Sequence, residues 1–208
     1  MKKAAIAVAL LVAAFLAARN WRIVAGRGEA RQAARALDYG ELALAVRLMN
    51  AAARHIPEDH ALARDAASLT EAMRLMREER AAEALPLLLP FRARSIVLQA
   101  EMAAAFERKD YEAFVEKARA AAAVRPGTAD AFLMLASADS CQYALTGEPQ
   151  LKERALRSLA EAGRKAAGPL GEIEQQIKHR LETREILSPA EFRARYPRGW
   201  RGLTPPSS

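Results

Sequence analysis

The chain has 208 residues, a formal net charge of +7 and a single cysteine; this length is enough for one domain with its own core, and one cysteine excludes an intrachain disulfide. Alanine occurs 49 times, and Ala, Leu, Arg and Glu dominate the composition while β-branched residues are sparse. Because these are strong helix formers, the composition predicts an all-α fold and argues against a sheet. Positive and negative residues alternate through most of the chain, so the net charge alone does not indicate a nucleic-acid surface.

The N-terminal segment, residues 1–25, has the features of a signal peptide or a membrane anchor. Lys2 and Lys3 precede an apolar run from residue 4 to residue 18, which is the layout of a secretory signal. Trp21 follows where an interfacial aromatic residue would lie. Because a clean cleavage site is missing, we favour an uncleaved anchor over a cleaved signal peptide.

The sequence gives two competing indications of the side of the membrane on which the body of the protein lies. Five arginines lie within or soon after this segment, and by the positive-inside rule they would keep the body in the cytoplasm. The two lysines and the short apolar run are instead typical of an export signal. We expect membrane contact through residues 4–25 and a membrane-anchored or periplasmic protein, with export favoured and a cytoplasm-facing anchor left open.

Residues 26–168 have the spacing of a helical repeat domain. Pro57, Pro90 and Pro126 are 33 and 36 residues apart, and a proline ends a helix because it lacks the N–H and clashes with the preceding turn. A helix end about every 34 residues is typical of a solenoid of helix hairpins. Small residues at helical spacing would let the paired helices approach closely.

The local sequences in this region resemble tetratricopeptide repeats. Four stretches carry the family's small, large and closing residues at matching positions: Gly40, Leu42, Ala45, Met49 and Pro57; Asp110, Tyr111, Ala113, Phe114, Ala118 and Pro126; Phe132, Leu135 and Ala136; and Ala155, Leu159 and Ala162. The resemblance implies a short α-solenoid of about four helix-turn-helix hairpins with a C-terminal capping helix, preceded by the N-terminal apolar helix.

Two of the four units depart from the repeat pattern. The second, residues 58–92, has a first helix that is too long, and Pro86 and Pro90 should break its second helix. The fourth carries extra residues around 146–150, which we place between its two helices.

Two short elements are expected after the repeats. Residues 169–187 predict the capping helix, with Ile173, Ile177, Leu181 and Ile186 on its apolar side and His179 in solvent. Residues 188–208 predict a short helix and a basic Pro/Gly/aromatic tail. Ser188 would be the N-cap of that helix, Pro189 its first residue and Glu191 the residue at the third position.

No group of residues in the sequence points to catalysis. His55 and His60 flank Glu58 and Asp59, but this spacing matches no standard metal site. Cys141 lies in an apolar stretch and is expected to be a core residue. We find no phosphate loop, nucleophile motif or zinc-type spacing, and we expect no catalytic residue, no cofactor and no metal. The chain is therefore not expected to be an enzyme.

The tetratricopeptide resemblance implies a scaffold or adaptor that binds a protein or peptide in a groove lined by the first helices of the hairpins. On this basis the groove residues would be Gln99, Leu133, Ser137 and Ser140. The alternative is a binder of anionic ligands, either lipid headgroups or nucleic acid, that uses the arginine-rich termini; nucleic acid is the less expected of these. The residues of the basic tail are Arg193, Arg195, Tyr196, Arg198, Trp200 and Arg201.

Overall fold

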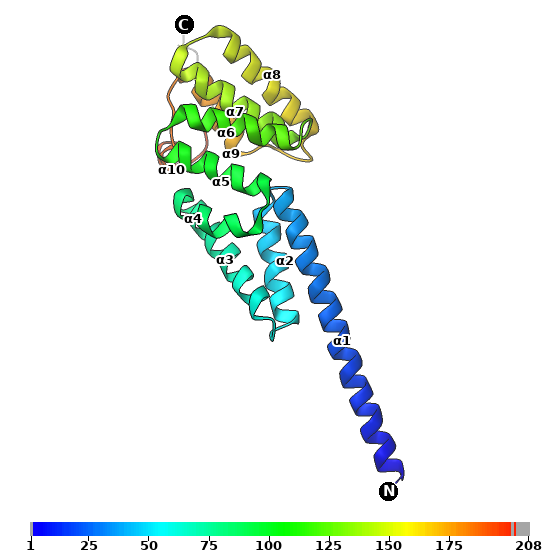
Figure 1. The fold of residues 1–208 in the computed structure, drawn as a ribbon. Coiled ribbons are helices and arrows are strands. Elements are labelled where there is room, and N and C mark those ends of the chain that lie inside the picture. The colour runs from blue at the N-terminus through cyan, green and yellow to red at the C-terminus, as the bar shows by residue number, and fades with distance from the viewer. Residues whose placement is uncertain (1, 201, 203–208) are drawn as a thin grey trace. The chain divides into compact units, whose positions relative to one another are not determined.

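A computed structural model describes residues 2–200 and 202, with side chains from residue 10 onward. Within this part of the chain there are ten α-helices, one short 3-10 helix at residues 89–91 and no strand, which confirms the all-α prediction (Figure 1). The helices are α1 Lys2–Asp38, α2 Leu42–His55, α3 His60–Arg77, α4 Ala81–Leu88, α5 Arg94–Glu107, α6 Tyr111–Val124, α7 Ala129–Thr146, α8 Pro149–Lys165, α9 Glu172–Thr183 and α10 Pro189–Arg195.

The chain divides into two compact units. The first consists of the residues up to Arg74 together with Pro86–Ile96, and the second consists of Leu75–Leu85 together with the residues from Val97 onward. Each unit has its own buried apolar residues.

The first unit is built on the pairing of α1 with α2. Ala33 and Leu37 on α1 and Ala45 and Ala52 on α2 are almost completely buried. The predicted division of the chain after residue 25 does not coincide with a break in structure, because α1 runs without interruption from Lys2 to Asp38. Its residues change from an exposed segment to a packed one within a single helix.

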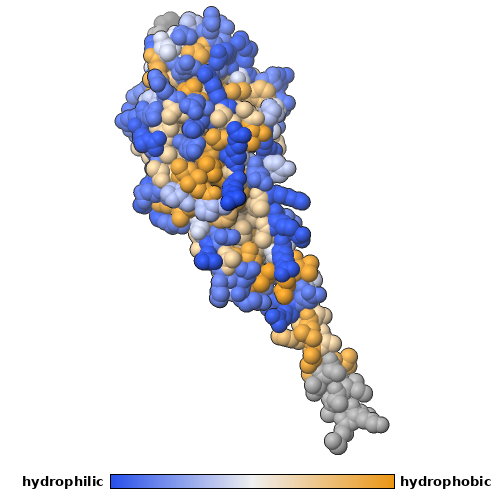
Figure 2. Space-filling model, viewed as in Figure 1, coloured by the Kyte–Doolittle hydropathy of each residue, from blue (hydrophilic) through white to orange (hydrophobic). Residues whose placement is uncertain are grey.

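The N-terminal half of α1 exposes large apolar side chains. The exposed fractions reach 71% for Leu11 and 67% for both Phe15 and Trp21, and Figure 2 shows hydrophobic colours on the helix next to the part drawn in grey. The ring of Trp21 makes an edge contact with His55 at the end of α2, with 6.1 Å between the ring centroids. Among the described residues, no helix combines the length and the apolar character needed to span a bilayer.

The second unit is organised around α7, which packs against α6, α8 and α9. Most of the buried residues on α7 are small, and they lie on several of its faces. The core on one side joins Cys141 to Phe114 and Val115 of α6. The core on the other side joins α7 and α8 to Ile177 and Leu181 of α9.

Several sequence predictions about helix ends can be compared with the structure. The start of α10 is confirmed, since the Ser188 side chain accepts a hydrogen bond from the Glu191 amide and the Glu191 side chain accepts one from the Ser188 amide. Pro86 lies inside α4 and does not end it, whereas Pro90 follows its end. Helix α3, which falls where we expected a long first helix in the second unit of the repeat pattern, has 18 residues.

The prediction of extra residues between the helices of the fourth hairpin is wrong. Only Gly147 and Glu148 separate α7 from α8, and the additional residues lengthen these helices to 18 and 17 residues. The turn is tight because Gly147 adopts the left-handed conformation with φ 76°, which glycine reaches without steric cost. Pro149 then starts α8 directly, because its missing N–H is not needed at the first helical position.

Two glycines on α1 provide a matched test of the α1–α2 packing. A Cβ at Gly26 would lie 2.7 Å from Ile56 Cγ1, whereas a Cβ at Gly28 would meet nothing within 4 Å. We expect Gly28→Ala to raise the free energy of unfolding by about 0.5–1 kcal/mol, because alanine is the better helix former. Gly26→Ala should lower it by about 1 kcal/mol or more through the overpacking against Ile56. Thermal unfolding followed by circular dichroism measures both, and equal effects of the two substitutions would contradict the packing.

Candidate functional site

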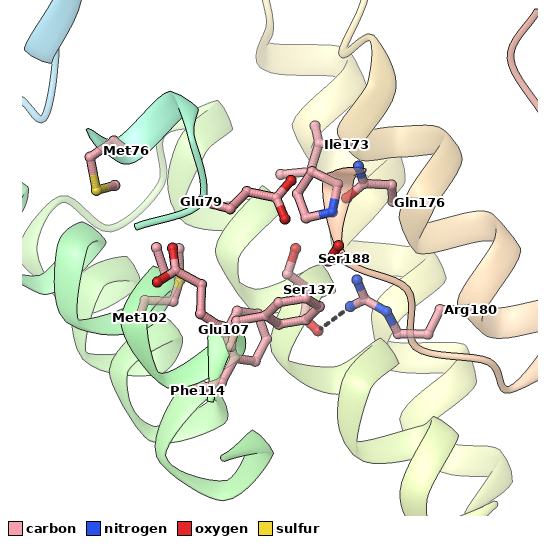
Figure 3. A pocket seen from close by; sticks show the side chains of 13 residues that line it. Met76, Glu79, Met102, Glu107, Phe114, Ser137, Ile173, Gln176, Arg180 and Ser188 are labelled. Atoms are coloured by element: carbon pink, nitrogen blue, oxygen red, sulfur yellow. Dashed lines mark hydrogen bonds between the residues drawn. The ribbon is translucent and has the colours of Figure 1, made fainter. Parts of the chain in front are cut away.

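A cavity of about 190 Å³ lies in the second unit and opens to its surface (Figure 3). Its apolar walls come from Met76, Met102, Phe106, Phe114 and Ile173. These residues lie near the end of α3 and on α5, α6 and α9. The cavity therefore combines segments that are far apart in sequence, and most of its exposed lining is apolar.

Arg180 of α9 is the most deeply buried polar residue of the cavity, with an exposed fraction of 4%. Its Nη1 donates to the hydroxyl of Ser140 at 3.0 Å and to the carbonyl oxygen of Ser137 at 3.3 Å, and its Cζ lies 5.8 Å from the ring centre of Phe106. Burial lowers the pKa of Arg180 from its ordinary value, against small opposing effects of Cys141 and Tyr111. Within the described part of the chain, no carboxylate lies within ion-pair distance of this guanidinium.

Two carboxylates do line the cavity, but each is held by another donor. Both carboxylate oxygens of Glu107 share the hydrogen of the Ala81 amide, at 2.8 and 2.9 Å from its nitrogen, and so cap the start of α4. Glu79 forms an ion pair with Arg193 at 3.3 Å. In Figure 3 the Glu107 carboxylate and the Arg180 guanidinium extend from different sides of the cavity.

A second polar cluster lies on α7, at Asp139. This carboxylate is buried, and it accepts hydrogen bonds from Arg119 of α6 at 3.1 Å and from Arg154 of α8 at 2.6 and 3.1 Å. Both arginines are about half exposed. The cluster ties three helices together and engages both oxygens of the carboxylate, so we regard it as structural.

Cys141 is completely buried in the α6–α7 core, as predicted. Burial raises the pKa of its thiol to about 11, with a smaller opposing effect of Arg180. Because the thiolate is the nucleophilic form, this position is unsuited to covalent catalysis. Within the described residues, no group of three or more His, Cys, Asp and Glu side chains could hold a metal ion.

The basic tail is packed against α9. Tyr196 and Trp200 lie with their ring centroids 5.2 and 5.4 Å from that of His179, and the Tyr196 hydroxyl is 3.0 Å from His179 Nε2. The expectation that His179 is in solvent is therefore wrong: its exposed fraction is 1%, and burial lowers its pKa. The tail covers a residue that the sequence places between two charged ones.

The arginines of the tail differ in their surroundings. Arg193 pairs with Glu79 and Glu172, and Arg195 pairs with Glu185 at 2.5 Å. Arg198 is exposed, and Arg201 lies outside the described residues. Two of the arginines expected to bind an anionic ligand thus already face carboxylates of the chain.

The four predicted groove residues do not form one surface. Ser137 lines the cavity, and Ser140 lies buried behind it, where it contacts Arg180. Leu133 packs instead against the core shared by α7, α8 and α9. Gln99 is half-buried on α5 and is not among the residues that line the cavity.

Sequence reasoning missed Asp139 and Arg180, although each leaves a signal. Asp139 is the only acidic residue between Asp130 and Glu148, and an isolated charge in an apolar helix calls for a partner. Arg180 comes three residues after Ile177, on the face that the apolar residues of α9 share. Neither signal reveals which helices supply the contacts.

Replacing the buried carboxylate tests the structural role of Asp139. We expect Asp139→Asn to lower the free energy of unfolding by about 1–3 kcal/mol, because it weakens hydrogen bonds to charged groups on two neighbouring helices. Glu153→Gln on α8 is the control, since this residue is 70% exposed and its pair with Arg157 contributes little. Urea unfolding measures both; a loss no larger for Asp139→Asn than for the control would refute the role.

Comparisons with known proteins add no identification. No protein-family model matches the chain, and neither does any curated protein or solved structure. The resemblance to tetratricopeptide repeats therefore rests on the residues named above, and function has to be argued from the geometry of the site.

Proposed function

We propose that this chain is a non-catalytic scaffold or adaptor that binds a protein or peptide, and that the cavity of the second unit receives a side chain of the partner. The observation that carries the proposal is the apolar wall formed by Met102, Phe106 and Phe114 together with Met76. Ligand sites are typically apolar concavities with few polar groups. Methionine side chains adapt to irregular shapes and are frequent on surfaces that bind peptides.

The chemistry of the cavity favours binding over catalysis. Glu107 caps a helix and Glu79 pairs with Arg193, so each carboxylate is already engaged by a donor of the chain. The hydroxyl of Ser140 donates to the carbonyl of Ser137 at 3.0 Å, and no general base contacts it among the described residues. A catalytic serine would need such a base within hydrogen-bond reach.

The repeat interpretation supports the same function. If α1–α2, α3–α4, α5–α6 and α7–α8 are the four hairpins, then α5 and α7 are first helices, and α9 is the capping helix. The tetratricopeptide resemblance implies that first helices line the groove, and both α5 and α7 contribute residues to the cavity. The solenoid arrangement of these hairpins is part of the proposal.

Blocking the cavity tests this function. Full-length protein is used to select peptides from a displayed library, and Ala103, which lines the cavity, is replaced by Trp. We expect the selected peptides to bind at least about tenfold more weakly to Ala103→Trp, because the indole fills the space that the ligand needs. Ala160→Trp, at an exposed position of α8, should bind them like the unmodified protein.

The peptide selection also tests whether the second unit has a peptide-binding site. Failure to enrich any peptide, or equal binding by both tryptophan variants, would overturn the proposal. Protection of Cys141 from a thiol reagent reports whether each variant keeps its α6–α7 core, because this thiol is completely buried in the intact unit.

We propose a second function, in which α1 attaches the chain to a membrane. This attachment would tether the scaffold. The exposed side chains of Leu11, Phe15 and Trp21 favour this attachment. Arg19 and Arg22 lie beside Phe15 at a surface depression next to His55, and cations beside exposed apolar groups suit an anionic lipid surface. The proposal extends to export or anchoring of the chain in a bacterial-type inner membrane.

Vesicle binding tests the attachment. We expect full-length protein to bind phosphatidylglycerol vesicles, and Phe15→Asp to weaken this binding about tenfold or more, because the gain from burying a phenyl group in the lipid is lost. Arg157→Glu on α8 changes charge at a position 68% exposed outside the apolar segment and should have a smaller effect. Cosedimentation measures binding; equal losses for both variants would indicate a non-specific charge effect and contradict attachment through α1.

A further inference from the structure

The cavity holds a buried cation that lacks an acidic partner among the described residues. We propose that the cavity recognises an acidic side chain, Asp or Glu, inserted by an otherwise apolar segment of a partner peptide, and that Arg180 binds its carboxylate. This inference rests on the proposed peptide-binding function, to which it adds the chemistry of the ligand.

The hydrogen bonds of Arg180 leave part of its guanidinium available. Nη1 is engaged by Ser137 and Ser140, which are neutral acceptors. Nε and Nη2 have no hydrogen-bond acceptor in the described part of the chain. Among the described residues, every fully buried polar atom of a side chain has a hydrogen-bond partner. These two nitrogens are therefore not fully buried, and Arg180 is one of the residues that line the cavity.

The free edge of the guanidinium matches a carboxylate. Nε and Nη2 lie on the same edge of the planar group, and two parallel hydrogen bonds from such an edge bind both oxygens of a carboxylate. Burying a charge without a counter-ion is costly. A ligand carboxylate would offset this cost, whereas a purely apolar ligand would bury the charge further.

The two carboxylates of the cavity do not take this role. Glu107 is held by the Ala81 amide and Glu79 by Arg193, and the electrostatic neighbours that act on Arg180 are Cys141 and Tyr111. The negative charges of Glu79 and Glu107 oppose additional acids near the cavity. We therefore expect one acidic residue in an apolar context to bind better than a run of acidic residues.

The size of the cavity limits what can enter it. A cavity of about 150 Å³ holds one benzene molecule, so about 190 Å³ accommodates one side chain and not a peptide segment. The methylene groups of an acidic side chain would contact Met102 and Phe106 while its carboxylate reaches Arg180. The net charge of +7 also favours association with an acidic partner.

Peptide selection with altered residues on both sides tests the proposal. The probes are random dodecapeptides displayed within a coat protein, so that they carry no free C-terminus, and the target is the full-length chain. We expect the enriched peptides to share one Asp or Glu among apolar residues. In the strongest binder, synthesised with blocked ends, replacing that acid by its amide should weaken binding at least about tenfold.

Arg180→Met provides the reciprocal change. The variant should bind the acidic peptide more weakly by a similar factor. It should bind the amide peptide no worse than the unmodified protein does. The loss of affinity from both changes together should therefore be no larger than the loss from either change alone. The substitution is expected to keep the fold, because replacing a buried charge by an apolar residue of similar size is often tolerated. Protection of Cys141 verifies this, and Arg157→Met is the control.

The outcomes separate this inference from the function on which it rests. If the enriched peptides lack an acid, or bind equally to Arg180→Met, the carboxylate inference is overturned, while their loss of binding to Ala103→Trp still supports a peptide site. If the strongest binder binds only when it is synthesised with a free C-terminus, and not with blocked ends, the assignment to a side chain is wrong. The peptide with the amide tests the inference even if Arg180→Met does not fold.

Discussion

The second unit depends on the close packing of three helices around α7. Helix α7 buries Ala136, Ala138, Ser140 and Cys141 almost completely, and these side chains are short, so α6, α8 and α9 can approach it from different directions. A helix enclosed in this way cannot keep its polar groups in water. The buried polar residues Ser137, Asp139 and Ser140 on α7 therefore need hydrogen-bond partners within the chain, and this requirement bears on where the buried charges of the unit lie.

The requirement is met differently on two sides of α7. Asp139 receives two arginines, one from α6 and one from α8, so one buried negative charge is balanced by two half-exposed positive ones. Ser137 and Ser140 instead receive the buried guanidinium of Arg180 from α9. Their oxygens are neutral, so this contact satisfies hydrogen bonds without balancing the charge. The first arrangement is complete within the chain, and the second leaves a cation facing a cavity.

The sequence predicts the all-α class, the start of α10 at Ser188 and the burial of Cys141, because each follows from local propensity or spacing. It fails where a residue's role depends on another segment. His179 looks solvated because Lys178 and Arg180 flank it, but α10 and the tail bring Phe192, Tyr196 and Trp200 against its ring. Of the predicted groove residues, only Ser137 lines the cavity. The cavity is also lined by residues of α9, and the repeat pattern predicted this helix as a cap and not as part of a groove.

Helix α9 has two structural roles in the second unit. Ile177 and Leu181 belong to the core that α7 shares with α8. Ile173, Gln176 and Arg180 lie on the cavity side, where Ser188 and Pro189 at the start of α10 join them. The packing of the tail on His179 holds α10 against α9, so the C-terminal segment supports the cavity wall without needing to contact a ligand. A change in the tail could therefore alter binding through the position of α9, even where the tail itself binds nothing.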